Sequence, residues 1–378
     1  MTNYRVPFVD VPTHFGRLRD QIMNVIEETL RQGNVVMRGE LREFERNFAV
    51  YMGKQYAIGV GSGTDALHLA LRAAGIGEGD EVVTVSHTCI STVSAIVHAG
   101  AVPILVDVCN DFNIDVDKVE EVLGPRTKAI LPVHLNGRAS AMARIMAMAQ
   151  RWNLIVIEDA AQALGARYDG RLVGSFGAAG VFSLYPFKML GAFGEAGIVV
   201  TDDPEIAQKV SILRDYGQDR DTGEILYFGF NSKLDNIQAA ILNVKLQYLP
   251  QWIERRRTIA QLYNAGLSGI PQLRLPPCGC DAYFDVFLNY CVMTAQRDAL
   301  VAHLRGRGVE PLLPISFAKP LHKHAALGLK HFQLPVTERI AGEFLYLPTN
   351  PELSDEQVEY AIECMQDFYT RREGGYGN

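Results

Sequence analysis

Short apolar segments alternate with helical stretches over the first two-thirds of the chain, and this alternation limits the possible folds most strongly. The segment "YAIGV" (56–60) has the composition of a strand, and the amphipathic stretch "TDALHLALRAAG" after it predicts a helix that stops near Gly75. The same strand pattern recurs at 81–86, 102–108, 129–135, 154–160, 179–185 and 197–203. Strands that alternate with helices predict parallel βαβ units.

Several of these predicted strands are apolar at every position, as in "LIVIE" (154–158). Such a strand has both faces covered, because an alternating pattern would leave one face in water. We therefore expect an α/β fold in which a mostly parallel sheet is sandwiched by helices.

The pattern changes near residue 243, where a long helical stretch (243–267) begins. We interpret it as the connection between a large domain (1–245, with an N-terminal arm) and a smaller α+β C-terminal domain (246–378). The arginine triplet 255–257 predicts a solvated helix face. The last eight residues, "RREGGYGN", are expected to fray.

Composition excludes several classes of protein. The formal net charge of −7 argues against a general nucleic-acid surface. Six cysteines are scattered, and "CGC" (278–280) lacks the spacing of a zinc knuckle, so we expect reduced thiols and no metal site. The first residues lack the features of a signal peptide, and no apolar run is long enough to span a membrane. These features predict a cytoplasmic protein.

The first segment with chemical potential is "GVGSGTDALHLALRA", in which a strand and a glycine turn precede a helix that is expected to begin at Thr64. Unpaired N–H groups at a helix start, together with the helix dipole, attract phosphate. The alternative is ordinary helix capping by the Ser-Gly-Thr-Asp sequence. The segment matches neither the Walker pattern nor GxGxxG, which argues against a nicotinamide oxidoreductase.

Two acids, Glu158 and Asp159, end the apolar strand at 154–159. Ligands of α/β proteins bind at the carboxyl ends of such strands. A carboxylate buried there needs a cation or several hydrogen-bond donors. The alternative is that Asp159 caps a helix formed by "AAQALGA" (160–166).

Lys188 lies in the apolar, glycine-rich stretch "SLYPFKMLGAFGEAG" (183–197). Apolar surroundings disfavour the charged amine, which makes it a better nucleophile toward an aldehyde. Alternatively, its stem packs on Tyr185 and Phe187 while the ammonium reaches water. A phosphate-binding helix start, a buried acid and an isolated lysine, in this order, match the three handles of pyridoxal phosphate.

Four segments of the chain resemble the successive signatures of the DegT–StrS family of fold type I, pyridoxal phosphate-dependent aminotransferases. They are "GSGTDALHLAL", "EDAAQALGA", "SLYPFKMLGAFGEAG" and "GFNSKLDNIQAAIL". The resemblance extends from "VPFVDV" to "YLPTNP" and implies a homodimer that acts on nucleotide-linked keto-sugars with L-glutamate as the amino donor.

The resemblance also implies roles for single residues around the cofactor ring. Lys188 matches the Schiff-base lysine, and Asp159 matches the acid that pairs with the pyridine nitrogen. Gln162 matches the amide near the ring hydroxyl, and His87 the side chain that stacks on the ring. Two alternatives stay open, namely a hydrogen-bonded core histidine for His87 and a helix-surface amide for Gln162.

For the phosphate, the resemblance implies a cradle made by Gly63, Thr64 and Ser183. Asn231 matches a residue that the family contributes from the second subunit, which implies active sites shared across a dimer. The alternatives are that Ser183 only satisfies an amide at a strand end and that Asn231 only makes a turn.

The substrate is less constrained than the reaction. "KMLGAFGEAG" resembles the branch that aminates C3, here of a 3-keto-6-deoxy sugar, in the biosynthesis of polysaccharide or glycoside amino-sugars; Lys188 speaks against the dehydratase branch. Amination at C4, a keto-inositol substrate and a non-catalytic, cofactor-binding regulator are the alternatives. Departures from the family pattern concentrate around the expected sugar pocket. They are Val35, Asn136, Glu195, Ala196, Tyr216 and the segment "LLPISFAKPLHKH".

Overall fold

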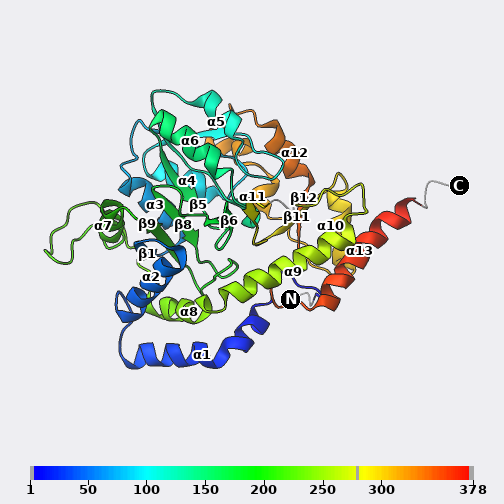
Figure 1. Ribbon diagram of the computed structural model, residues 1–378, viewed down its shortest axis with the longest axis horizontal. Helices are drawn as coiled ribbons and strands as arrows, with labels where there is room; N and C mark the ends of the chain where they lie inside the picture. Colours follow the sequence, from blue (N-terminus) through cyan, green and yellow to red (C-terminus); the bar gives the residue numbers. More distant parts are fainter. Residues whose placement is uncertain (1–3, 278–280, 374–378) are drawn as a thin grey trace.

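A seven-stranded sheet lies at the centre of the computed structural model, which describes residues 4–277 and 281–373 (Figure 1). The strand order is β1-β9-β8-β5-β4-β2-β3, and only β9 runs antiparallel to its neighbours. The strands are β1 (Tyr56–Val60), β2 (Glu81–Val85), β3 (Val102–Val106), β4 (Thr127–Ile130), β5 (Ile155–Asp159), β8 (Ala179–Ser183) and β9 (Gly197–Thr201). The predicted α/β fold with a mostly parallel sheet is confirmed.

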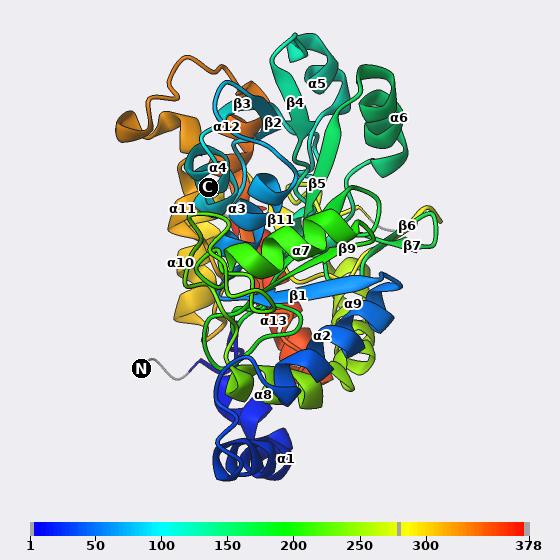
Figure 2. The same cartoon turned by 90° about the vertical axis from the view of Figure 1, so that its left-hand side faces the viewer.

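Both faces of the sheet are covered, as the fully apolar strands require. In β9, Val199 packs into one buried cluster, whereas Ile198 and Val200 pack into another. Helices α3 (Gly63–Ala73) and α7 (Pro204–Leu213) contribute to the first cluster, and α2 (Gly39–Met52) and α8 (Asn236–Leu246) contribute to the second. In Figure 2, α7 and α2 lie on opposite sides of β1. The remaining helices of this half are α1 (Val11–Arg31), α4 (Ile90–His98), α5 (Val116–Val122) and α6 (Met142–Trp152).

Helix α3 begins one residue earlier than predicted, because Ser62 is its N-cap and accepts a hydrogen bond from the Asp65 N–H at 3.1 Å. The helix ends at Ala73, and Gly75 then takes the left-handed conformation (φ +79°) that stops it, as the sequence predicts.

Residues 160–166 do not form the helix of the capping alternative, so the alternative role of Asp159 as a helix cap is wrong. Asp159 instead accepts a hydrogen bond from the Ala161 N–H at 3.2 Å, which closes a tight turn. Gly165 has φ +92°, and Ile253 packs where its side chain would be. The segment therefore forms consecutive turns that bury Ala160, Ala163 and Ala166.

The C-terminal part consists of helices around a small sheet. Helix α9 (Leu249–Leu267) is separate from α8, so the continuous helix predicted for 243–267 is interrupted, and Pro250 lies in its first turn, where a missing N–H costs little. The remaining helices here are α10 (Arg297–Gly306), α11 (Ile315–Ala318), α12 (Pro335–Glu343) and α13 (Asp355–Glu373). The sheet is an antiparallel pair, β11 (Tyr290–Met293) with β12 (Phe344–Leu347). A third sheet joins β10 (Tyr283–Phe284), β6 (Arg167–Tyr168) and β7 (Arg171–Leu172).

Across the predicted domain boundary, side chains from each part of the chain pack into the core of the other part. Val6 of the N-terminal arm pairs with Val309 and packs into the C-terminal core. Conversely, Phe344 and Tyr346 pack into the core of the main sheet. The division at residue 245 stays a prediction.

The arginine triplet 255–257 is not the solvated face that the sequence predicts. Arg256 is 8% exposed, and its Nη1 donates to the carbonyl oxygens of Leu288 (3.2 Å) and Thr349 (3.0 Å). Arg257 donates to the Asp285 carbonyl at 2.7 Å. The prediction of a solvated face was wrong. Runs of charged residues usually lie in water, whereas these arginines donate to backbone carbonyls of loops that pack against α9.

Within residues 4–277 and 281–373, no helix is long and apolar enough to cross a membrane. The same residues contain no group of three or more His, Cys, Asp or Glu side chains that could hold a metal ion. Cys89, Cys109, Cys291 and Cys364 are free thiols. Cys278 and Cys280 of the "CGC" segment lie outside the described residues.

Candidate active site

The carboxyl end of β8 meets the first turn of α3, as the predicted phosphate site requires. A Cβ placed on Gly63 would lie 2.7 Å from Cβ and 3.1 Å from Cα of Ser183, so only glycine permits this approach. Beside it, the Thr64 hydroxyl donates to Oγ of Ser91 at 2.8 Å. The structure thus brings Gly63, Thr64 and Ser183 together, and it adds Ser91, which sequence reasoning missed.

Asp159 ends β5 at the same edge of the sheet and is 4% exposed. Its Oδ2 accepts a hydrogen bond from the Thr92 hydroxyl at 2.8 Å. Burial raises the pKa of Asp159, whereas the hydrogen bonds from Thr92 and Ala161 and the charge of Lys188 oppose this rise. The carboxyl group is therefore held by donors, in a position where a cation would stabilise its charged form.

Lys188 lies close enough to Asp159 for the two charges to interact. Burial lowers the pKa of the Lys188 amine, and the Asp159 carboxylate, followed by Cys89, opposes that shift. Its own backbone is fixed by a 2.9 Å hydrogen bond from the Lys188 N–H to the Tyr185 carbonyl. Asp159 and Lys188, which are 29 positions apart in the sequence, are thus brought into one site.

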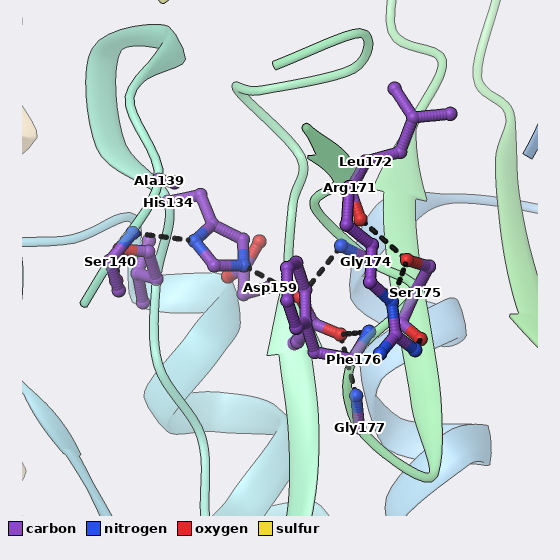
Figure 3. A network of polar contacts seen from close by, with 12 residues as sticks. His134, Ala139, Ser140, Asp159, Arg171, Leu172, Gly174, Ser175, Phe176 and Gly177 are labelled. Atoms are coloured by element: carbon purple, nitrogen blue, oxygen red, sulfur yellow. Dashed lines mark hydrogen bonds and ion pairs between the residues drawn. The ribbon is translucent and has the colours of Figure 1, made fainter. Parts of the chain in front are cut away.

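Glu158, the neighbour of Asp159, has a structural task. Its oxygens accept hydrogen bonds from three backbone N–H groups of loop 174–177, at 2.6–2.8 Å, and one of them lies 3.0 Å from Nε2 of His134. Figure 3 labels His134 and the three donor residues, Gly174, Phe176 and Gly177, and marks these contacts with dashed lines. The Ser140 N–H donates to Nδ1 of His134 at 2.9 Å, so the imidazole proton sits on Nε2 and points to Glu158. This satisfied network fixes the loop that leads into β8.

His87 lies in an aromatic core. Its ring centroid is 5.7 Å from that of Phe112, 5.4 Å from Phe317 and 5.5 Å from Phe344, and the side chain is 1% exposed. Neither ring nitrogen has a hydrogen-bond partner among the described residues, and burial lowers the pKa of His87 to about 4. This packing does not support the predicted stacking role, because no open face is left for a cofactor ring. It supports a core position, although without the hydrogen bond of the core alternative.

Cys89, two positions further on, is the side chain of this turn that faces the site. It is exposed, precedes the first residue of α4, and its thiol is among the groups that act on the Lys188 charge. Sequence reasoning missed both Cys89 and Thr92. Their presence in the same "HTCIST" segment as His87 is the signal that could have indicated them.

Gln162 lies in the turn after Asp159 rather than on a helix surface. Its Oε1 accepts hydrogen bonds from the Asn136 N–H (3.0 Å) and from Nδ2 of Asn289 (3.3 Å). Asn136 itself takes φ +59° and has a buried Nδ2 without a partner among the described residues. Gln162 therefore joins the segment near β5 to the chain that enters β11. Its role at a ring hydroxyl stays a prediction.

Asn231 is not brought into this group. Its side chain is exposed, and its backbone pairs with Asp215 at the base of an excursion over residues 216–230. Apolar side chains are unusually exposed on this excursion, and Phe228 is 96% exposed. The others are Tyr216, Ile225, Leu226 and Tyr227.

Residues 17–366 match the model of the DegT/DnrJ/EryC1/StrS aminotransferase family. The chain belongs to this family. It is accordingly an aminotransferase of the pyridoxal phosphate-dependent, fold type I class, and the family resemblance predicted from the four sequence segments is confirmed.

Two curated relatives match nearly the whole chain. One is the dTDP-3-amino-3,4,6-trideoxy-alpha-D-glucose transaminase of Streptomyces venezuelae, 39% identical over 371 residues, with 97% of each chain covered. The other is named "Pleiotropic regulatory protein", from Geobacillus stearothermophilus, and is 40% identical over 370 residues, with 96% of this chain and 98% of the relative covered.

Two solved structures share the fold. DesV of S. venezuelae, in complex with a ketimine intermediate, superposes with a TM-score of 0.92 at 39% identity and covers 97% of this chain and 98% of its own. NtdA of Bacillus subtilis, with bound cofactor PMP, gives a TM-score of 0.90 at 31% identity, with 98% of this chain and 87% of NtdA covered.

The residues of the site fit pyridoxal phosphate. The close approach of Gly63 to Ser183 brings the Ser183 hydroxyl beside the first turn of α3, whose unpaired N–H groups suit a phosphate. Asp159 offers a buried acid for a basic ring nitrogen, and Lys188 offers an amine with a lowered pKa for an aldehyde.

Proposed function

We propose that this aminotransferase uses pyridoxal phosphate to convert a nucleotide-linked 3-keto-6-deoxy sugar to the 3-amino sugar, with L-glutamate as the amino donor. The observation that carries the proposal is the electrostatic contact between Lys188 and Asp159 at the edge of the sheet where α3 begins. The S. venezuelae relative, named for a dTDP-3-amino sugar, supports amination at C3.

Each residue has a defined task in this proposal. The cofactor, when bound, supplies an aldehyde that condenses with amines and a ring that accepts electrons. The N–H groups at the start of α3, with the hydroxyls of Thr64 and Ser183, hold its phosphate. Asp159, stabilised by Thr92, keeps a proton on the ring nitrogen.

Lys188 has two tasks, binding the cofactor and moving a proton. Its burial disfavours the ammonium form, so that a larger fraction of the amine is a free base near neutral pH. With cofactor and amino donor bound, Nζ would take a proton from the substrate carbon as general base and return it as general acid.

We further propose a homodimer in which Asn231 serves the partner's site. The support is the apolar excursion 216–230, which carries exposed side chains that water disfavours and starts and ends beside Asn231. Mixing Lys188→Ala with Asn231→Ala subunits should restore activity relative to either variant alone if sites are shared. The cytoplasmic location stays a prediction.

A regulator without turnover is the second candidate, because one relative bears a regulatory name. Amination at C4 and a keto-inositol substrate remain as outcomes of the substrate test. Addition of L-glutamate distinguishes the regulator from the enzyme. A catalytic protein loses the visible absorption band of the cofactor imine when L-glutamate is added, whereas a regulator keeps this band.

The decisive experiment reduces the protein with borohydride after incubation with pyridoxal phosphate and maps the modified peptide. The adduct is expected on Lys188 and absent from Lys188→Ala. Turnover is then measured with dTDP-, UDP- and GDP-linked keto-sugars, and the position of the new amine is read by NMR. An adduct on another residue, or none, would overturn the proposal.

A further inference from the structure

A second lysine is buried directly behind the loop that carries Lys188. Lys245, on α8, is 2% exposed, and its Nζ donates a hydrogen bond to the carbonyl oxygen of Gly191. The ammonium also lies 4.7 Å from the ring centroid of Phe193 and 6.0 Å from that of Trp252. No carboxylate among the described residues forms an ion pair with it.

The same helix holds this loop at a second point. Gln238 lies seven residues before Lys245, so two helical turns place both side chains on one face of α8. Its Oε1 accepts a hydrogen bond from the Phe193 N–H at 2.9 Å. Between them, Gln238 and Lys245 bind one N–H and one carbonyl group of the stretch 191–193, three to five residues after Lys188.

A small hollow lies beside the loop. Its volume is about 50 Å³, and it is lined by the loop (186–193), the start of α1, Trp252 and residues 350–352. On its other side the loop is anchored, because Met189, Leu190 and Ala192 pack into the second buried cluster and the Ala192 N–H donates to the Leu184 carbonyl at 2.8 Å. Toward the hollow, the backbone of residues 191–193 is held by its two contacts with α8.

The charged groups around the hollow are occupied elsewhere. Asp10 caps α1, and His14 binds Glu352 at 2.9 Å. Arg256 donates to two backbone carbonyls. Lys188 interacts electrostatically with Asp159. None of these groups replaces the bond from Lys245 to the loop.

We propose that Lys245 is a positioning residue that sets the backbone of the loop after Lys188, and so the place from which the Lys188 amine acts. A hydrogen bond from a buried ammonium to a carbonyl is charge-assisted and stronger than a neutral one. Without it, the Gly191 carbonyl loses its buried donor, and the backbone at this residue can shift toward the hollow. The inference rests on the proposed function only in assigning Lys188 as the reacting amine.

The charge of the Lys245 side chain depends on pH. Burial lowers the pKa of Lys245 to about 8, so its charge, and with it the strength of the bond to Gly191, is lost in mildly alkaline solution. An arginine at this position stays charged over the same range. We therefore expect the rate of adduct formation at Lys188 to depend on pH differently with lysine and with arginine at position 245.

The test compares Lys245→Met, which keeps length but loses charge and donor, with Lys245→Arg, which keeps both, in the full-length protein. Lys330→Met, at an exposed lysine, is the matched control. Two quantities are measured: the rate of borohydride-trappable adduct formation at Lys188 from apoprotein and pyridoxal phosphate, and hydrogen exchange of the amides of residues 189–194.

Lys245→Met is expected to slow adduct formation about tenfold, the effect of losing one hydrogen bond to a charged group, and to speed exchange across 189–194. Lys245→Arg should recover most of the rate and extend it above pH 8. Gln238→Leu, which removes the other contact of α8 with the loop, should speed the same exchange and keeps the test decisive if Lys245→Met does not fold.

Unchanged exchange together with an unchanged rate in Lys245→Met would overturn the inference. If wild-type protein forms no adduct at Lys188, the proposed function fails instead. Exchange at residues 189–194 then decides on its own whether Lys245 holds the loop.

Discussion

The Thr92 hydroxyl donates a 2.8 Å hydrogen bond to Oδ2 of Asp159, and Oγ1 of Thr88 lies 2.8 Å from Oγ1 of Thr92. Because the proton of Thr92 points to the carboxylate, Thr88 must be the donor in the second bond. The two threonines thus form a relay that ends on a carboxyl group 4% exposed to water. Such a chain polarises each member and stabilises the negative charge of Asp159 against its burial.

Thr92→Val should weaken cofactor binding about tenfold, because it leaves a buried carboxylate oxygen without its donor. The loss favours the protonated form of Asp159, which cannot pair with a protonated ring nitrogen. Dissociation constants for pyridoxal phosphate, measured by fluorescence titration of apoprotein, check this. Thr92→Ser retains the hydroxyl and should bind nearly as wild type, and equal affinities for Val and Ser would show that the relay is irrelevant.

Asp159→Asn should leave the cofactor bound but reduce turnover on the order of 10²-fold, the size of losing one charged group that acts on the reacting system. The amide keeps the shape of the side chain but cannot hold a proton on the ring nitrogen. Cofactor content by absorbance and single-turnover rates with L-glutamate measure the two effects separately. Full turnover in this variant would exclude the role given to Asp159.

Glu158→Gln should destabilise the protein by about 3 kcal/mol without a comparable loss of cofactor affinity. The amide end of glutamine presents N–H groups to the donors of loop 174–177 or His134, so at least one buried hydrogen bond is lost. Urea unfolding monitors the change. Glu121→Gln, at an exposed acid paired with Lys118, should shift stability by less than about 0.5 kcal/mol.

Periodicity predicted the main sheet well, because fully apolar strands and the amphipathic pattern of α3 are properties of each segment alone. The alternative for segment 160–166, a helix favoured by its alanines, is wrong, because Asp159 binds the Ala161 N–H and Ile253 packs against Gly165. Tertiary contacts outweigh local propensity there, and no local pattern reports them.

The candidate site likewise contains residues that the sequence predicts and residues that it does not. Lys188 and Asp159 were predictable because an isolated lysine and a strand-end acid are unusual in apolar surroundings. The position of His87 was not, because its surroundings include Phe317 and Phe344, more than 200 residues away in the sequence. A motif places a residue on the chain, and only the packing decides which of its neighbours faces the site.

His87 should make the protein sensitive to acid. Its pKa in the folded protein, about 4, lies below the usual 6.5, so between these values the unfolded chain binds a proton that the folded chain does not. The free energy of unfolding is therefore highest above pH 6.5 and falls as the pH drops toward 4. His87 contributes about 3 kcal/mol to this loss. Urea unfolding of the full chain measures this change in the free energy of unfolding. It is carried out at about pH 7.0 and about pH 4.5, near the two ends of the range.

In His87→Phe this part of the acid sensitivity should disappear, because phenylalanine does not titrate. Its apolar ring is also compatible with the neighbouring rings of Phe112, Phe317 and Phe344. The variant should also be no less stable at pH 7, since it removes two buried ring nitrogens that have no partner among the described residues. His331→Phe, at an exposed histidine, is the control and should keep the wild-type pH profile. Equal losses of stability on acidification in wild type and His87→Phe would mean that the His87 imidazole is protonated inside the fold, with a partner that its aromatic surroundings do not provide.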